Sequence, residues 1–207
     1  MNQTAMTQLN QRPCWIFDMD GTLTHAVHDF EEMRMALGLP PGQPILESIA
    51  ARSPEEAEKL HRHLYEIEHL LATNAIAQPG ARSLLSRLQL DGRRIGILTR
   101  NSEALAHITL QAAGLSEFFE DAFIIGRERC APKPDPAGIN LLMELWSSTP
   151  DDTVMIGDYL FDLQAGRSAG TMTIHFDSQG SFQWPEESDL NVCDLEKLAT
   201  HLDKGSS

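Results

Sequence analysis

Two carboxylates, one residue apart, follow the first strongly apolar segment of the chain. Cys14–Phe17 are four consecutive bulky residues, a run typical of a short strand that is buried on both faces. The next five residues, 18–22, read Asp-Met-Asp-Gly-Thr. Because carboxylates at the end of a buried strand cannot join the core, we expect Asp18 and Asp20 at the mouth of the sheet, where open α/β proteins bind ligands. Paired carboxylates there could divide a nucleophilic and an acid–base role, or hold a hard metal ion.

More polar residues of this kind occur later in the chain. Thr99 and Arg100 follow the second predicted strand, and Asp158 follows the fourth. Lys133 lies in the string Ala-Pro-Lys-Pro-Asp-Pro, in which the flanking prolines keep the backbone extended. Phosphoryl transfer needs a nucleophile, a proton donor for the leaving oxygen, and positive charge on the phosphoryl oxygens. Asp, Thr, Lys and Asp in this order supply these groups.

The three motifs together resemble the signature of the haloacid dehalogenase-like (HAD) hydrolases. The motifs are Asp-x-Asp-Gly-Thr after an apolar strand, the lysine between prolines, and Gly-Asp-x-x-x-Asp at 157–162. Most members of that family are magnesium-dependent phosphatases, and the resemblance covers residues 13 to 176. It implies that Asp18 is the nucleophile and forms an aspartyl-phosphate. It also implies that Asp20 is the general acid for the leaving group and then the base that activates water.

The resemblance further implies residues that bind phosphate and metal. Thr99 would donate a hydrogen bond to a phosphoryl oxygen, and Lys133 would neutralise both the nucleophile and the phosphate. Arg100, beside the strand end, could help to orient an anionic substrate. The implied ligands of Mg²⁺ are Asp18, the backbone carbonyl of Asp20, Asp158 and Asp162. Asp162 would act through a water molecule or hold the other ligands in place.

Each of these residues also has a purely structural explanation. Asp, Gly and Thr are common turn residues, Asp158 could simply cap the following helix, and Arg100 could be solvated. The joint order of the residues favours the catalytic interpretation. No role is predicted for His25, His28, Arg127 or the loop 177–189.

From residue 80 onward, predicted strands alternate with predicted helices, which is typical of parallel βαβ units. The predicted strands are 14–17, 94–98, 122–125, 153–156 and 171–176. The predicted helices are 81–90, 102–113, 136–146, 160–169 and a terminal helix that carries Leu195, Leu198 and Leu202. Residues 1–12 are predicted to be a loose polar lead-in. The predicted fold class is α/β, a doubly wound parallel sheet.

A small all-helical cap is predicted between the first strand and the rest of the core. It comprises residues 25–78, so that residues 1–24 and 79–207 form the HAD-like core. Its predicted helices are 28–39, 44–51 and a long helix that starts at Ser53. The Ser-Pro-Glu-Glu sequence there is typical of a capped helix start.

The position of the cap resembles the phosphoglycolate phosphatase-like branch, although the segment is somewhat short for it. A small cap that excludes water indicates a small phosphomonoester, such as a phosphorylated carboxylic acid, sugar or nucleotide. A phosphomutase of the same branch keeps every motif residue and stays open. A haloacid dehalogenase is disfavoured by the second acid, Asp20. A phospho-acceptor module like the response-regulator receivers is disfavoured because its acceptor lies on a later strand.

Composition limits the partners of the chain. Of its 207 residues, 42% are hydrophobic, and the formal net charge is −14. This charge argues against nucleic acid and anionic membranes as partners, so we expect a small phosphorylated metabolite.

Three widely spaced cysteines form no disulfide framework, and the polar start of the chain has no apolar signal-peptide core. We therefore expect a cytoplasmic protein, a monomer or a homodimer.

Overall fold

A single parallel sheet forms the centre of the protein. The computed structural model describes residues 3–25 and 30–203. Six strands run parallel in the order β3-β2-β1-β4-β5-β6. Their bounds are β1 Cys14–Phe17, β2 Arg94–Leu98, β3 Ile124–Ile125, β4 Thr153–Gly157, β5 Met172–Phe176 and β6 Leu190–Val192.

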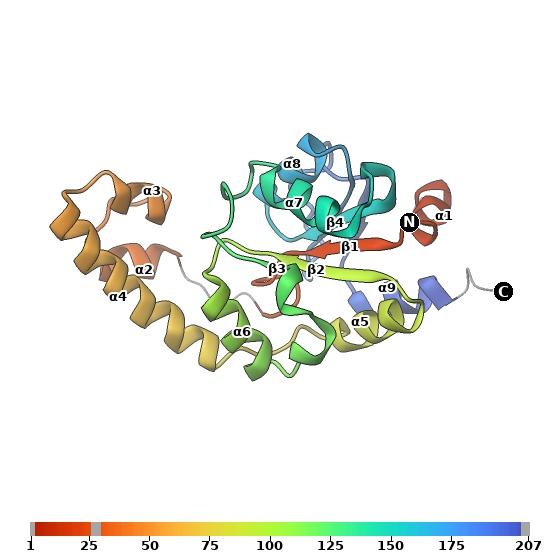
Figure 1. Cartoon of the computed structure of the whole chain (residues 1–207), viewed down its shortest axis with the longest axis horizontal. Coiled ribbons are helices and arrows are strands. Elements are labelled where there is room, and N and C mark those ends of the chain that lie inside the picture. Colours follow the sequence, from red (N-terminus) through yellow and green to blue (C-terminus); the bar gives the residue numbers. More distant parts are fainter. Residues whose placement is uncertain (1–2, 26–29, 204–207) are drawn as a thin grey trace.

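Helices cover both faces of this sheet, because successive side chains of each strand point to opposite faces. Trp15 and Phe17 of β1 pack into one core, and Cys14 and Ile16 pack into the other. The first core is covered by α5 (Ala81–Leu90), α6 (Glu103–Ala112) and α9 (Leu195–Asp203). The second is covered by α7 (Ala137–Trp146) and α8 (Leu160–Ser168), on the opposite side of the sheet in Figure 1. The predicted doubly wound α/β fold is confirmed.

The order of the strands reverses between β1 and β4. From β1 the chain proceeds through β2 and β3 towards one edge, and from β4 through β5 and β6 towards the other. Phe17 pairs with Ile156 in register, so the ends of β1 and β4 lie side by side. Ligands of doubly wound proteins bind at the carboxyl ends of the strands at such a reversal. The residues that follow β1 and β4 therefore occupy the expected ligand site.

Three details differ from the prediction. The predicted lead-in 1–12 contains a helix, α1 (Gln3–Asn10), because Ala5, Met6 and Leu9 form a stripe that is buried in the first core. The third strand is shorter than predicted, since residues 121–123 form a 3₁₀ turn. The short edge strand β6 was not predicted at all.

The segment after β1 is helical, as predicted. It contains α2 (Phe30–Ala36), α3 (Ile45–Ala50) and α4 (Pro54–Thr73), and it extends to the left end of the molecule in Figure 1. α4 begins with the expected capping box, in which Ser53 and Glu56 bond each other reciprocally. The segment has its own hydrophobic cluster, which includes Met33, Ile49 and Leu64. That residues 25–78 form a separate cap domain stays a prediction.

Candidate active site

Asp18 and Lys133 form the buried centre of the site. The amide of Asp18 donates to the carbonyl of Ile156 at 2.9 Å, so the residue extends the pairing of β1 with β4 by one step. The Nζ atom of Lys133 lies 2.5 Å from Asp18 Oδ1 and 2.6 Å from Asp162 Oδ1. Only 3% of Lys133 is exposed, and its backbone lies in the proline-flanked loop. The structure thus brings together three residues that are widely separated in the sequence.

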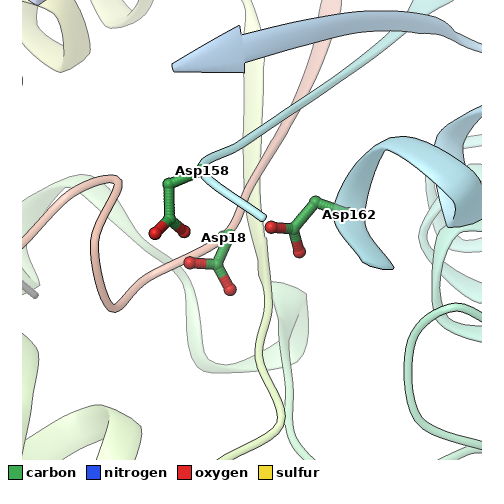
Figure 2. Close-up of side chains that lie close together, drawn as sticks. All are labelled: Asp18, Asp158 and Asp162. Carbon is green, nitrogen blue, oxygen red and sulfur yellow. The ribbon is translucent and has the colours of Figure 1, made fainter. Parts of the chain in front are cut away.

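Asp158 and Asp162 complete a cluster of three carboxylates with Asp18. One oxygen atom from each of them lies within 4.8 Å of the others, and Figure 2 shows the three side chains gathered at one point. Asp162 is fixed on α8 because its Oδ2 accepts the amide of Tyr159 at 3.0 Å. Gly21, with φ of +94°, lets the chain pass close to Asp158, since a Cβ atom there would overlap the Asp158 carboxylate.

The charges of this cluster are strongly perturbed. Burial raises the pKa of the Asp18 carboxyl well above its ordinary value, although the attraction of Lys133 opposes this. Burial, together with the charge of Asp162, raises the pKa of Asp158 to about 7. Burial disfavours the Lys133 ammonium, but Asp162 and Asp18 outweigh this effect, so the pKa of Lys133 is raised. Lys133 therefore stays positively charged, but its single charge does not balance the negative charges of the surrounding carboxylates.

The donor set fits a hard divalent cation. Mg²⁺ prefers carboxylate oxygens and keeps several waters or substrate oxygens in its shell. The oxygens of Asp18 and Asp158 are close enough to share one ion, and the raised pKa values show that both would gain from a further positive charge. Asp162 is held by Lys133 and Tyr159, so it fits the supporting role that the sequence suggested for it. The predicted contribution of the Asp20 carbonyl stays a prediction.

Asp20 has a hydrogen-bond partner outside this cluster. Its Oδ2 accepts a hydrogen bond of 2.7 Å from Nδ2 of Asn101. The Asn101 backbone is fixed in turn, because its amide donates to Thr99 Oγ1 at 3.1 Å and its carbonyl accepts the amide of Arg127 at 3.0 Å. Thr99 is buried at the end of β2 and lines the cavity, and its predicted phosphate contact stays a prediction. The contact between Asn101 and Asp20 could not be foreseen from the motifs.

A cavity of about 400 Å³ connects these residues with the helical segment. Its core side presents Asp18, Asp20, Thr99, Lys133, Asp158 and Asp162. Its other side is mainly apolar, with Phe30, Met33, Pro44, Ile45, Leu46 and Leu64, and it also presents Arg34, Gln43 and Glu68. A small molecule in this cavity would therefore contact the predicted catalytic groups at one end and apolar side chains at the other.

Two arginines near strand ends connect the core with the helical segment. Arg100 lies 3.0 Å from Glu47 of α3, and its guanidinium lies over the ring of Phe161. Arg127 forms two hydrogen bonds with Glu68 of α4, at 3.0 and 3.1 Å. The predicted phosphate contact of Arg100 stays a prediction. Sequence reasoning missed both glutamates, although Glu68 lies four residues after Leu64, on the apolar side of α4.

The other described residues without a predicted role do not line the cavity. His25 is exposed, and its amide donates to the carbonyl of Ile76 at 3.0 Å. His28 lies outside the described residues. In the loop 177–189, the rings of Phe182 and Trp184 pack against buried His175. This loop therefore supports the sheet end behind Asp158.

The chain has no helix in its described part that is long and apolar enough to cross a membrane.

Residues 14–170 match the family model of the haloacid dehalogenase-like hydrolases. A HAD-like hydrolase domain-containing protein of Arabidopsis thaliana is 31% identical over 181 residues, which cover 81% of this chain and 71% of that protein. A phosphoglycolate phosphatase of Pseudomonas putida is 27% identical over 186 residues, which cover 77% of this chain and 67% of that enzyme.

Solved structures show the same fold. A hydrolase from Pseudomonas syringae superimposes with a TM-score of 0.77 at 24% identity, covering 95% of this chain and 100% of that one. CbbY from Rhodobacter sphaeroides, in complex with phosphate, gives a TM-score of 0.76 at 21% identity, covering 93% and 99%. The family match over most of the chain and the 31% identical relative confirm the resemblance that the motifs indicated. The protein belongs to the haloacid dehalogenase-like hydrolases, on the branch that includes the phosphoglycolate phosphatases.

Proposed function

We propose that the protein is a magnesium-dependent phosphatase that hydrolyses a small phosphomonoester through an aspartyl-phosphate on Asp18. The observation that carries the proposal is the position of Asp18. It lies at the strand reversal, 2.5 Å from a buried lysine and beside two further aspartates, and it faces a cavity of about 400 Å³. The names of the phosphoglycolate phosphatase relatives support the reaction class.

The first step transfers the phosphoryl group to the protein. A carboxylate oxygen of Asp18 forms a bond to phosphorus while the bond from phosphorus to the ester oxygen breaks. Asp20, in its protonated form, gives its proton to that leaving oxygen. Lys133 and Thr99 bind phosphoryl oxygens as charge shifts onto them. When bound, Mg²⁺ supplies positive charge that offsets the crowded carboxylates and the phosphoryl group.

The second step releases phosphate. Asp20, now a carboxylate, takes a proton from water while the water oxygen forms a bond to phosphorus. The bond between phosphorus and Asp18 breaks, which frees inorganic phosphate and restores both aspartates. The helical segment is proposed to act as a cap that excludes bulk water during these steps. The cavity size and the net charge of −14 support a small metabolite as the partner. The cytoplasm stays the proposed location.

The test is release of inorganic phosphate from an aryl phosphate, with Mg²⁺ and with a chelator. The wild type should turn over with Mg²⁺ alone, and Asp18→Asn should be inactive while its circular dichroism spectrum is unchanged. Mg²⁺ should also raise the melting temperature of the wild type, a readout that does not depend on turnover. Full activity of Asp18→Asn would overturn the mechanism. Transfer of the phosphoryl group to a sugar hydroxyl instead of water would identify a phosphomutase.

A further inference from the structure

We propose that Arg34 binds a carboxylate of the leaving group, so that the substrate is a phosphomonoester with an apolar body and a second anionic group. This inference rests on the proposed phosphatase function and specifies which leaving group the cavity accepts. It concerns the helical side of the cavity, which the motif residues do not address.

The first observation is the balance of charge around the cavity away from the cluster of Lys133 and the aspartates. Among the described residues that line this part, the charged ones are Arg34, Arg100, Arg127 and Glu68. Glu31 and Glu47 pair with Arg34 and Arg100 but do not belong to that lining. The lining there therefore presents more positive than negative charge, and it attracts an anionic group of a bound molecule.

The second observation singles out Arg34 among these arginines. Its side chain is only 14% exposed, and its Nε atom is buried without a hydrogen-bond partner among the described residues. Nη1 donates to the carbonyl of Phe30 at 2.9 Å. Nη2 lies 3.4 Å from Glu31 Oε1, which is longer than the about 2.7 to 2.9 Å of a strong hydrogen bond between charged groups. The guanidinium thus keeps a buried donor unused, which is unfavourable until an acceptor binds there.

The other two arginines gain less from a new anion. Arg100 already donates to Glu47 at 3.0 Å, and Arg127 donates to both oxygens of Glu68 at 3.0 and 3.1 Å. A carboxylate at either position would replace an existing hydrogen bond, so the number of bonds would not increase. At Arg34 it would engage a donor that is unused. Arg34 is therefore the arginine at which a carboxylate gains most.

The geometry of a guanidinium favours a carboxylate as the group that binds. Nε–H and one Nη2–H project from the same edge of the planar group, so they match the two oxygens of a carboxylate. Glu31 is 58% exposed, so it can yield Nη2 to a bound carboxylate at little cost. The single positive charge of Arg34 balances a carboxylate, whereas a phosphate dianion would keep an uncompensated charge.

The third observation is the apolar lining near Arg34. Met33, the next residue on α2, and Leu64 of α4 are 5% and 1% exposed and belong to the cluster of the helical segment. Ile45 and Leu46 of α3 pack against this cluster and also line the cavity. An apolar body gains from contact with these side chains, whereas a carboxylate among them needs a charged donor to replace its lost hydration. Arg34 is thus a specificity-determining residue for such a leaving group.

The experiment compares esters of the same shape in the wild type and in Arg34→Gln, with Mg²⁺ present. Carboxyphenyl and carbamoylphenyl phosphates, substituted at position 3 or 4, have leaving groups that differ in charge but hardly in size. The ratio of kcat/KM for the carboxyl ester to that for the carbamoyl ester should fall at least about tenfold in Arg34→Gln, because a hydrogen-bonded charge pair is lost. Comparing the two proteins cancels the intrinsic reactivity of the esters. An unchanged ratio for both positions would overturn the inference.

The matched control is Arg62→Gln, in the same helical segment. Arg62 lies on α4, is 69% exposed and pairs with Glu58 at 3.6 Å, so its loss should leave the wild-type ratio unchanged. A fall in the ratio as large as that of Arg34→Gln would overturn the assignment to Arg34. If circular dichroism shows that Arg34→Gln does not fold, Arg34→Lys replaces it. This variant keeps the charge but loses the paired donors, so its ratio should still fall at least about threefold, and an unchanged ratio would again overturn the inference.

Failure of the inference can be told apart from failure of the phosphatase function. If the wild type hydrolyses the esters and Arg34→Gln keeps the wild-type ratio, the function stands and the inference falls. If the wild type hydrolyses none of them, the function falls, and calorimetric titration of this inert protein with the same esters still tests Arg34. Tighter binding of a carboxyl ester that Arg34→Gln abolishes would support the carboxylate site, and equal binding of the carboxyl and carbamoyl esters would overturn it.

Discussion

The hydrogen bond from Asn101 to Asp20 leads to a prediction about how the leaving group is protonated. Nδ2 of Asn101 donates to Asp20 Oδ2 at 2.7 Å, while the Asn101 backbone is fixed by Thr99 and Arg127. Asn101→Ala therefore removes one contact with the proposed general acid and leaves the loop in place. Because the amide nitrogen only donates, it holds Oδ2 as an acceptor and directs the acid proton of Asp20 to its other oxygen.

The size of the effect follows from the kind of bond that is lost. A hydrogen bond to a charged group contributes about 1.5 to 3 kcal/mol. If that contribution is lost in the transition state, the rate falls by about 10- to 150-fold. The loss should appear only where proton donation matters. An alkoxide leaving group needs the proton, whereas 4-nitrophenolate leaves with little help.

The assay is kcat/KM for benzyl phosphate and for 4-nitrophenyl phosphate, two aromatic esters of similar size. This parameter reports the steps up to transfer of the phosphoryl group to Asp18, so the second step does not mask the difference. Asn101→Ala should lose about 10- to 150-fold on the benzyl ester and much less on the nitrophenyl ester. Asn140→Ala, an exposed substitution on α7, is the control and should change neither value. Equal losses on both esters would refute the reasoning.

Three further predictions concern the stability and shape of the site. Lys133→Met leaves two buried carboxylates without their cation, so it should abolish turnover and lower the free energy of unfolding by about 3 to 5 kcal/mol in urea titrations. Gly21→Ala should abolish the Mg²⁺-induced rise in melting temperature, since the new Cβ displaces Asp158; an undiminished rise would contradict the assigned metal site. Leu9→Ala, in α1, should cost about 2 to 5 kcal/mol of unfolding free energy, because Leu9 is fully buried; a loss near zero would show that α1 is dispensable for the core.

Local sequence was sufficient to predict the parts of the site that lie next to strand ends. The run Cys14–Phe17 is uniformly apolar, so it had to be a buried strand, and the position of Asp18 followed from that. Asp158 followed in the same way from β4. For Lys133, the flanking prolines left an extended loop, and family resemblance supplied the rest. The positions of Asp18 and Asp158 were predictable because each depends on a few neighbouring residues, while the catalytic roles stay predictions.

The contacts between distant segments could not be predicted in this way. Glu68 meets Arg127 only because α4 packs against α6 of the core, a contact that the periodicity of α4 does not specify. The helix α1 was missed because its sequence is mostly polar and its apolar stripe is short. The strand β6 was missed because three residues at a sheet edge carry almost no pattern.

The two ends of the cavity make opposite electrostatic demands on a substrate. At the phosphoryl end, burial has raised the pKa of Asp18 and Asp158, whose oxygens lie close enough to share one ion, so an added positive charge there would be stabilised. At the other end, Arg100 and Arg127 are paired with Glu47 and Glu68 of the helical segment. Since the charges of Glu47 and Glu68 come from the helical segment, substitutions there should change which esters are accepted without altering Asp18, Lys133 or the chemical steps.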